Sequence, residues 1–359
     1  MIDEISVMKV EWMITRRCQF KCSYCRIRDE RTLKGVELST EEVLKGVRVI
    51  RDRFPGAAIV FFGGEPTLRD DLPDIIRYCE DIDQKYAIIS NSVRLLNDDN
   101  YRRRLMEAGL SNWTVSIDGM DRSQTVDDYT YHRVSNGLKA LRILRDDYGV
   151  RDLVASATVT RKSIERIPDM VEAMTKEGIW SIICMLQIAK PGHEYSQGSV
   201  NDLPTPEQAR LIAPILSEMA RSERYLMHNE GAWFDRWLTD DIQRQDWVCN
   251  GKAGITIDAD GSLKYCVEVP FSQKDRMFIS DLATDSGWEK YNDVFRRGVT
   301  CSGCVWDTAY EMIRRANETL GEVEGRRSFR HEISSQRLMK LLPEARHWFE
   351  GNPTLRRVK

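Results

Sequence analysis

Between residues 7 and 190 the sequence alternates between apolar, β-branched runs and amphipathic helical patterns, and this alternation restricts the fold more than any other feature. The apolar runs predict strands, and the stretches between them predict helices. The expected strands are residues 7–15, 57–62, 86–90, 113–117, 153–160 and 180–188. The expected helices are residues 40–53, 72–82, 98–108, 133–147 and 164–177. Strands that alternate with helices predict a parallel sheet with right-handed crossovers. Because six units are too few to close an eight-fold barrel, we expect an α/β fold with a partial (β/α)6 TIM-like barrel.

The pattern changes after about residue 190, where Lys190-Pro191-Gly192 interrupts the alternation. A helix is expected from about residue 204 to 224, and a second from 233 to 242. An Asp-Gly turn at 260–261 lies between two short apolar runs and predicts a β-hairpin. We therefore divide the chain into a barrel core (1–195), a helical linker (196–248), a small cysteine-rich subdomain (249–305) and a helical C-terminal tail (306–359).

The composition is that of an ordinary soluble protein. Of the 359 residues, 42% are hydrophobic and 30% are charged, and the formal net charge is -3. This balance gives no reason to expect binding to nucleic acid or to a membrane surface. The first residues lack a cationic start followed by an apolar run, so we expect no signal peptide and a cytoplasmic protein. Nine cysteines in such a chain are more typical of metal ligands or catalytic groups than of disulfides.

Three of these cysteines, Cys18, Cys22 and Cys25, follow directly on the first expected strand. Three thiolates on a short loop can bind three irons of a cubane cluster, which leaves the fourth iron open to another ligand. A structural zinc site needs four ligands, and no fourth Cys or His is adjacent. A zinc site completed by a distant fourth ligand is the alternative.

The C-x3-C-x2-C spacing, with Tyr24 before the last cysteine, resembles the radical S-adenosylmethionine (SAM) superfamily. Three further motifs follow in the family's order at the ends of later strands. They are Gly63-Gly64-Glu65-Pro66, Ser90-Asn91-Ser92 and Val115-Ser116-Ile117-Asp118-Gly119. Serines replace the Thr and Gly of the family's second motif. The resemblance covers about residues 8–190 and implies a (β/α)6 barrel that binds SAM across the carboxyl ends of the strands.

The resemblance also implies the chemistry. A 4Fe–4S cluster held by the three cysteines binds SAM at its open iron and, once reduced, cleaves it to a 5′-deoxyadenosyl radical that abstracts a substrate hydrogen. An external electron donor of the flavodoxin or ferredoxin type is then needed. The residues expected to contact SAM are Tyr24 beside adenine, Gly63, Gly64 and Glu65 at the methionine end, and Asn91, Ser116 and Asp118 at the ribose or carboxylate.

Four cysteines form a second group, Cys249, Cys266, Cys301 and Cys304. Cys249, a G-x4-C segment ending at Cys266 and a distal C-x2-C resemble the auxiliary-cluster region of the SPASM/twitch branch of this superfamily. No cysteine follows Cys304, which favours the shorter twitch form with one auxiliary 4Fe–4S cluster. A fully ligated second cluster would transfer electrons. A four-cysteine zinc site is the alternative.

Candidate acid–base groups lie close to this second group of cysteines. Asp258, Glu230 or His228 could deprotonate a substrate radical intermediate, provided that they reach it by hydrogen bond. Cys184 lies within an apolar strand and is expected to be a core thiol. The alternative for Cys184 is donation of a hydrogen atom to a substrate radical.

These observations favour a small-molecule radical SAM enzyme, with dehydrogenation or rearrangement of a small polar metabolite such as a cyclitol, sugar or amino-acid derivative. The combination of core and four-cysteine region is similar to that of radical SAM dehydrogenases acting on an aminocyclitol. Modification of a peptide or protein side chain is the second hypothesis. It is weakened because Cys18 lies too near the start of the sequence for a preceding peptide-binding domain. A non-catalytic iron–sulfur or zinc protein is the third.

Overall fold

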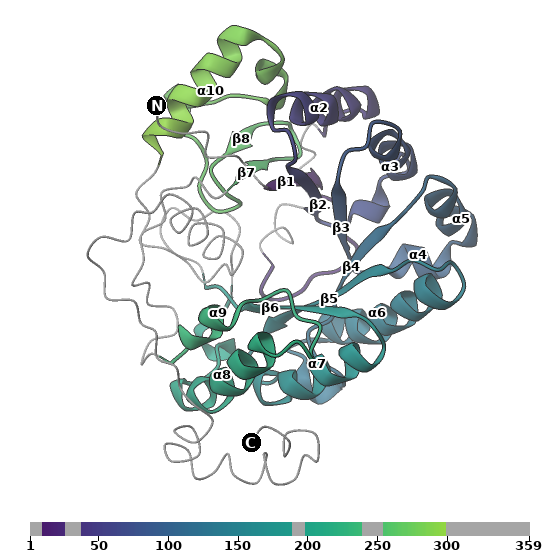
Figure 1. Cartoon of the computed structure of the whole chain (residues 1–359), viewed down its shortest axis with the longest axis vertical. Helices are drawn as coiled ribbons and strands as arrows, with labels where there is room; N and C mark the ends of the chain where they lie inside the picture. Colours follow the sequence, from purple (N-terminus) through teal and green to yellow (C-terminus); the bar gives the residue numbers. More distant parts are fainter. Residues whose placement is uncertain (1–8, 26–36, 189–197, 239–253, 299–359) are drawn as a thin grey trace.

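The computed structural model describes residues 9–25, 37–188, 198–238 and 254–298, and these residues form a single curved sheet with helices outside it (Figure 1). The eight strands of the sheet have the order β6-β5-β4-β3-β2-β1-β7-β8. The strands are β1 (Lys9–Thr15), β2 (Ala58–Gly63), β3 (Tyr86–Ser90), β4 (Asn112–Ser116), β5 (Asp152–Val159), β6 (Trp180–Met185), β7 (Ile255–Ile257) and β8 (Leu263–Lys264). Strands β1 to β6 pair in parallel with their neighbours, whereas β7 and β8 are antiparallel to each other.

Helices follow the strands and lie on the convex side of the sheet (Figure 1). They are α2 (Thr40–Arg53), α3 (Leu72–Asp81), α4 (Val93–Asn97), α5 (Asp99–Glu107), α6 (Asp128–Asp146), α7 (Ile167–Lys176), α8 (Pro206–Arg221), α9 (Gly231–Asp235) and α10 (Asp285–Arg297). Short 3₁₀ turns are η1 (Pro66–Leu68), η2 (Arg122–Gln124), η3 (Ile164–Arg166), η4 (Val200–Asp202), η5 (Gln273–Asp275) and η6 (Ile279–Ala283). The sheet does not close among the described residues, which confirms the α/β fold and the open barrel.

The hydrophobic core lies between the sheet and its helices because each strand alternates its side chains between two faces. In β1, Val10, Trp12 and Ile14 are buried. Helix α2 lies directly over them, since a Cβ added to Gly46 would come within 2.4 Å of the Trp12 ring. The opposite face of the sheet, which carries Glu11, lines the interior of the barrel.

Helix boundaries follow local capping. Ser39 accepts a hydrogen bond from the amide of Glu42, whose side chain binds back to Ser39 and starts α2 as the sequence predicts. The sequence analysis placed the start of the fourth helix at residue 133, but α6 begins at Asp128. Asp127 caps it with Thr130 as the reciprocal partner, a Thr at a position where a Glu or Gln is usual, so the pattern was missed.

The predicted hairpin forms, with Asp258 and Gly261 at its turn and Gly261 in the left-handed region at φ +83°. Its first strand, β7, pairs in parallel with β1, so the hairpin extends the barrel sheet itself. Helix α10 was not predicted. It packs through Trp288 and Tyr291 against Phe54, the residue that ends α2.

Several predictions of the sequence analysis concern residues outside the described ranges. These are residues 239–242 of the predicted helix 233–242, the tail 306–359, and Cys249, Cys301 and Cys304. The four domain boundaries remain predictions.

Within the described residues, no helix combines the length and the apolar character needed to cross a membrane.

Candidate functional site

A cavity of about 250 Å³ opens at the carboxyl ends of the barrel strands and along their inner face. All three cysteines of the first group line it, together with six residues expected to contact SAM. The cysteines are Cys18, Cys22 and Cys25, and the SAM residues are Tyr24, Gly63, Gly64, Glu65, Asn91 and Ser116. Residues up to 98 positions apart in the sequence, Cys18 and Ser116, thus meet in one place. This is the position that ligands occupy in parallel α/β barrels, where the strand ends supply the functional groups.

The cysteines lie on the loop 16–25, called here the Cys18 loop, which is bound tightly to the turn after β2. The amide of Gly64 donates to the carbonyl of Thr15 at 2.8 Å, and the amide of Glu65 to that of Arg17 at 2.7 Å. A Cβ on Gly64 would lie 2.1 Å from the Arg17 oxygen, and one on Gly63 would lie 2.3 Å from the Thr15 oxygen. The sequence analysis assigned these glycines to close approach of SAM. The structure shows a second reason for them, since only glycine lets the turn pack on the Cys18 loop.

Glu65 is buried at the base of the cavity and organises two strand ends. Its carboxylate accepts hydrogen bonds from Thr67 and Ser90 and from the Asn91 amide, at distances of 2.6 to 3.0 Å. Burial raises the pKa of Glu65, although these hydrogen bonds favour the charged form. The side chain is thus committed to holding the ends of β2 and β3 together.

The cysteine thiols are buried, so they need positive charge nearby in order to lose their protons. Burial raises the pKa of Cys18 to about 12 and that of Cys22 to about 11. Donors already face the sulfurs, because the Phe20 amide lies 3.4 Å from Cys18 Sγ and Arg133 Nη1 lies 3.7 Å from Cys22 Sγ. Among the described residues, no three Cys, His, Asp or Glu side chains yet converge closely enough to hold a metal ion. The donor set and the shared cavity fit an iron–sulfur cluster, which would supply the missing positive charge.

Behind Tyr24 lies a charged network that the sequence analysis missed. Arg133 of α6 donates to Tyr24 Oη at 2.7 Å and forms an ion pair with Asp118 at 3.2 Å. Asp118 also accepts from the Tyr24 hydroxyl and from the Thr158 amide. Burial alone would lower the pKa of Arg133, but Asp118 raises it well above its ordinary value. Asp118, expected to contact SAM, therefore contacts these groups and does not line the cavity.

Asn91 and Ser116 do line the cavity, and Asn91 is already oriented. Its side-chain oxygen accepts from Gln19 of the Cys18 loop at 3.0 Å and from the amide of Val93 at 3.1 Å. These two hydrogen bonds to one oxygen fix the orientation of the side-chain amide. The residue thus connects the end of β3 with the Cys18 loop.

Asp258, the first candidate base, is buried between two cations. Arg16 lies 2.7 Å from one carboxylate oxygen and Lys264 lies 2.6 Å from the other. Burial by itself would raise the pKa of Asp258, but Lys264 and Arg16 hold it below its ordinary value. A carboxylate with two cationic partners and a low pKa is a poor proton acceptor, so this geometry favours an electrostatic role.

The other two candidate bases lie elsewhere. The His228 ring packs against Trp180, tilted, at 4.8 Å between ring centroids, and its backbone N–H donates to the carbonyl of Ser181. These contacts place it at the amino end of β6, opposite to the edge that carries the cysteines. Burial lowers the pKa of His228. Glu230 precedes α9 at its N-cap position. Neither residue lines the cavity of the Cys18 loop.

The structure also places Cys184 and two polar residues of the strands and their ends in the site. Cys184, expected in the core, is half-buried and lines the cavity, because alternate residues of β6 face the barrel interior. Glu11 and Gln187 also line it. The sequence did contain a signal for Glu11. It lies in the middle of the first expected strand, and a carboxylate inside a parallel strand is unusual unless it serves a site.

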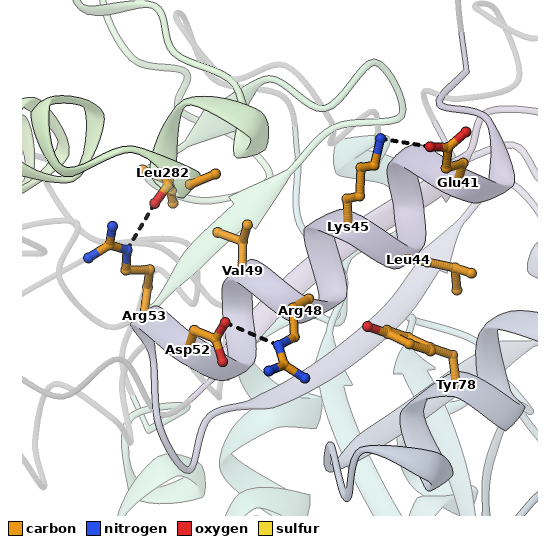
Figure 2. Close-up of a pocket in the computed structure, with 10 residues that line it drawn as sticks. Glu41, Leu44, Lys45, Arg48, Val49, Asp52, Arg53, Tyr78 and Leu282 are labelled. Atoms are coloured by element: carbon orange, nitrogen blue, oxygen red, sulfur yellow. Dashed lines mark hydrogen bonds and ion pairs between the residues drawn. The ribbon is translucent and has the colours of Figure 1, made fainter.

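A second cavity, of about 620 Å³, lies on the outer surface between α2, α3 and η6 (Figure 2). Its charged side chains pair with their own neighbours: Lys45 with Glu41 at 2.7 Å and Arg48 with Asp52 at 3.2 Å. Arg53 donates to the Leu282 carbonyl at 3.0 Å, and the remaining walls are aliphatic and aromatic. It has none of the cysteines or barrel-end residues and lies on the convex side of the sheet.

Comparison with known proteins agrees with the site. Residues 12–185, which include all three strand-end motifs and all three cysteines of the first group, match the family model of the radical SAM superfamily. Residues 12–185 form a radical SAM domain. Membership implies a 4Fe–4S cluster and SAM as cofactors.

Among curated relatives, Fe-coproporphyrin III synthase of Methanosarcina barkeri is 30% identical over 62% of this chain and 53% of its own length. PqqA peptide cyclase of Granulibacter bethesdensis is 30% identical over 57% of this chain and 53% of its own. The chain thus spans about half the length of these two relatives. A probable GTP 3′,8-cyclase of Methanothermobacter thermautotrophicus is 27% identical over 73% of this chain and 84% of its own.

The fold is also similar to that of a solved structure. Streptococcus suis SuiB bound to S-adenosylmethionine superposes with a TM-score of 0.57 and 14% identity, covering 80% of this chain and 66% of that one. This likeness supports the architecture of the sheet and its helices.

Proposed function

We propose that this protein is a radical SAM enzyme that abstracts a hydrogen atom from a small polar metabolite in a dehydrogenation or rearrangement. One observation carries the catalytic part of the proposal. The three cysteines and six of the predicted SAM residues, which come from four separate segments, line a single cavity inside a radical SAM domain. An adjoining cavity supports this function over a purely structural metal site, which would be closed and would not need a pocket.

Each group of residues has a part in this reaction. Bound to Cys18, Cys22 and Cys25, the 4Fe–4S cluster would supply the electron that cleaves SAM to methionine and a 5′-deoxyadenosyl radical. Glu65 and Asn91 hold the strand ends where the methionine group would bind. The barrel walls keep water from a reactive species that would otherwise be quenched.

The character of the cavity supports a small polar substrate. Away from the cysteines its walls carry the hydroxyls of Ser156 and Thr158, the amide of Gln187 and the carboxylate of Glu11, set among aliphatic side chains. Such a surface offers hydrogen bonds at a few defined points. Two relatives, named for a porphyrin synthase and a GTP cyclase, also point to small molecules. The relative named as a peptide cyclase keeps modification of a peptide as the second candidate.

We further propose a second 4Fe–4S cluster at Cys249, Cys266, Cys301 and Cys304, acting in electron transfer. Cys266 follows the hairpin that extends the barrel sheet, and its neighbour Val267 lines the cavity. The chain after the hairpin therefore runs past the proposed active site. An electron carrier there would be close to the substrate.

Replacement of Cys22 by Ala tests the central assignment. Anaerobically reconstituted wild type should carry about eight irons per chain and release 5′-deoxyadenosine after reduction, because each cubane contains four irons. The Cys22→Ala variant should lose about four irons and all SAM cleavage. Iron content and 5′-deoxyadenosine are measured together by colorimetry and chromatography.

Cys79→Ala is the matched control, because Cys79 is fully buried in α3 and is not among the residues that line the cavity of the Cys18 loop. It should retain the irons and the cleavage. Equal cleavage by the Cys22 and Cys79 variants would overturn the catalytic assignment. About four irons together with one zinc in the wild type would overturn the second cluster.

A further inference from the structure

An ion triad joins the two cysteine-bearing parts of the chain. Arg16 lies two residues before Cys18, and Lys264 lies two residues before Cys266. Asp258 stands between them, with one carboxylate oxygen 2.7 Å from Arg16 Nη2 and the other 2.6 Å from Lys264 Nζ. The segment 254–266, which contains β7 and β8 and ends at Cys266, is called here the Cys266 hairpin.

The charges of this triad are held in place and are shielded from solvent. The side chain of Asp258 is 3% exposed, that of Lys264 is 10% exposed and that of Arg16 is 25% exposed. The amide of Ala259 also donates to the Asp258 carboxylate at 2.7 Å. Salt and water screen buried pairs much less than surface pairs, so these charges act on their surroundings more strongly than exposed charges would.

The hairpin that carries Asp258 is itself fixed to the barrel. Strand β7 pairs with β1 at Val10, Glu11 and Trp12, a few residues before the Cys18 loop. The amide of Leu38 donates to the carbonyl of Ala259 at 3.0 Å. These contacts hold Asp258 in place relative to Arg16, and the two would separate only if the Cys266 hairpin moved.

We propose that Asp258 is a positioning residue that couples the Cys266 hairpin to the Cys18 loop and lowers the reduction potential of the iron–sulfur cluster held by Cys18, Cys22 and Cys25. The inference rests on the proposed cluster and assigns Asp258 a role other than that of a base. Its basis is the juxtaposition of one buried carboxylate with a cation from each cysteine-bearing segment.

The direction of the effect follows from charge. Reduction adds an electron to the cluster, so a nearby cation favours the reduced state and a nearby anion opposes it. Arg16 brings a cation to the Cys18 loop, two residues before Cys18, and Asp258 offsets its charge. Replacing Asp258 by Asn keeps the shape and removes the anion, so the potential should rise. Replacing Arg16 by Gln removes the cation, so the potential should fall.

The test is a redox titration of the anaerobically reconstituted full chain, monitored by electron paramagnetic resonance in the absence of SAM. The signal that disappears in Cys22→Ala identifies the cluster of the Cys18 loop. Asp258→Asn should make its one-electron reduction about tenfold more favourable, a positive shift of about 59 mV. Arg16→Gln should shift it in the opposite direction, and the double variant should return it toward the wild-type value. Asp258→Glu should keep the wild-type value because it retains the anion.

Asp260→Asn is the matched control. Asp260 is a carboxylate on the same hairpin, but it is partly exposed and pairs with Arg276 at 3.4 Å. Its replacement should leave the potential unchanged.

Two results would overturn the inference. One is a shift of the same sign in the Asp258 and Arg16 variants, which a merely structural role for Asp258 predicts. The other is an unchanged potential in Asp258→Asn. A wild-type protein that forms no cluster on the Cys18 loop would overturn the proposed function and this inference together.

Discussion

At the scale of single residues, Arg133 is the group on which the polar network behind Tyr24 depends. Its guanidinium lies against the Asp118 carboxylate, the Tyr24 hydroxyl and the sulfur of Cys22. The ion pair is largely buried, with side-chain exposures of 12% for Arg133 and 3% for Asp118. Removing one partner from a buried pair leaves the other charge without compensation, which costs more than the pair itself contributes.

Arg133→Gln should therefore lower the free energy of unfolding by about 3–5 kcal/mol. Adding Asp118→Asn should restore part of this loss, because the unpaired charge is then gone. Denaturant unfolding of the metal-free protein measures both values. Arg122→Gln is the control, since Arg122 pairs with Asp128 on the surface and should cost only about 0–1 kcal/mol. A double variant that is less stable than Arg133→Gln would contradict this account of Asp118.

At the scale of the elements, the Cys18 loop takes much of its shape from contacts with distant segments, above all the turn after β2. The backbone of Thr15 and Arg17 is held by the amides that follow Gly63. Glu37 adds side-chain support, accepting from the Thr15 hydroxyl at 2.6 Å and from the Arg16 amide at 3.1 Å. The conformation that presents the cysteines is thus imposed by residues about 20 to 50 positions away in the sequence.

Gly64→Ala should consequently reduce iron binding by the Cys18 loop. The new methyl group would lie 2.1 Å from the Arg17 carbonyl oxygen, so the loop must move away and lose its two backbone hydrogen bonds. About four of the expected eight irons should be lost. Gly149→Ala is the control, because its Cβ would meet no atom within 4 Å, although its φ of +70° makes it cost about 1 kcal/mol of stability. Full iron content in Gly64→Ala would show that the turn does not shape the loop.

At the scale of the whole molecule, the segment from β7 to α10 packs on the β1 end of the barrel (Figure 1). The contact on the outer side is aromatic: Phe54 meets Trp288 and Tyr291 edge-on at 5.3 and 5.6 Å. Arg53 adds a hydrogen bond to the Leu282 carbonyl and an ion pair with Asp285. Barrel and hairpin segment therefore share one sheet and one core.

Phe54→Ala should remove this contact and destabilise the protein by about 3–5 kcal/mol, the usual cost of deleting a large buried aromatic side chain. Hydrogen exchange should accelerate in α10 and η6 before it does so in α5 or α6. Val200→Ala is the control, because Val200 is 64% exposed, and its replacement should change stability by no more than about 0.5 kcal/mol. Uniform acceleration over all helices would argue against a local contact.

The sequence by itself determined most of the barrel. Alternating burial in strands such as β1 and a capping box such as that of Ser39 and Glu42 are local patterns, so the six parallel strands and most of the helices between them could be predicted. It also indicated the three cysteines and the strand-end motifs, because their spacing is short and their order is fixed.

Only the tertiary structure decided which side chains meet. Arg133 lies 111 residues from Cys22, and Asp258 lies 242 residues from Arg16, and no local pattern connects such pairs. The tertiary structure also removed His228 from the cavity and brought Cys184 into it, because the end and face of a strand that a residue occupies depend on pairing with other strands. Local periodicity predicts an element, whereas the contacts of a buried charge depend on how the elements pack.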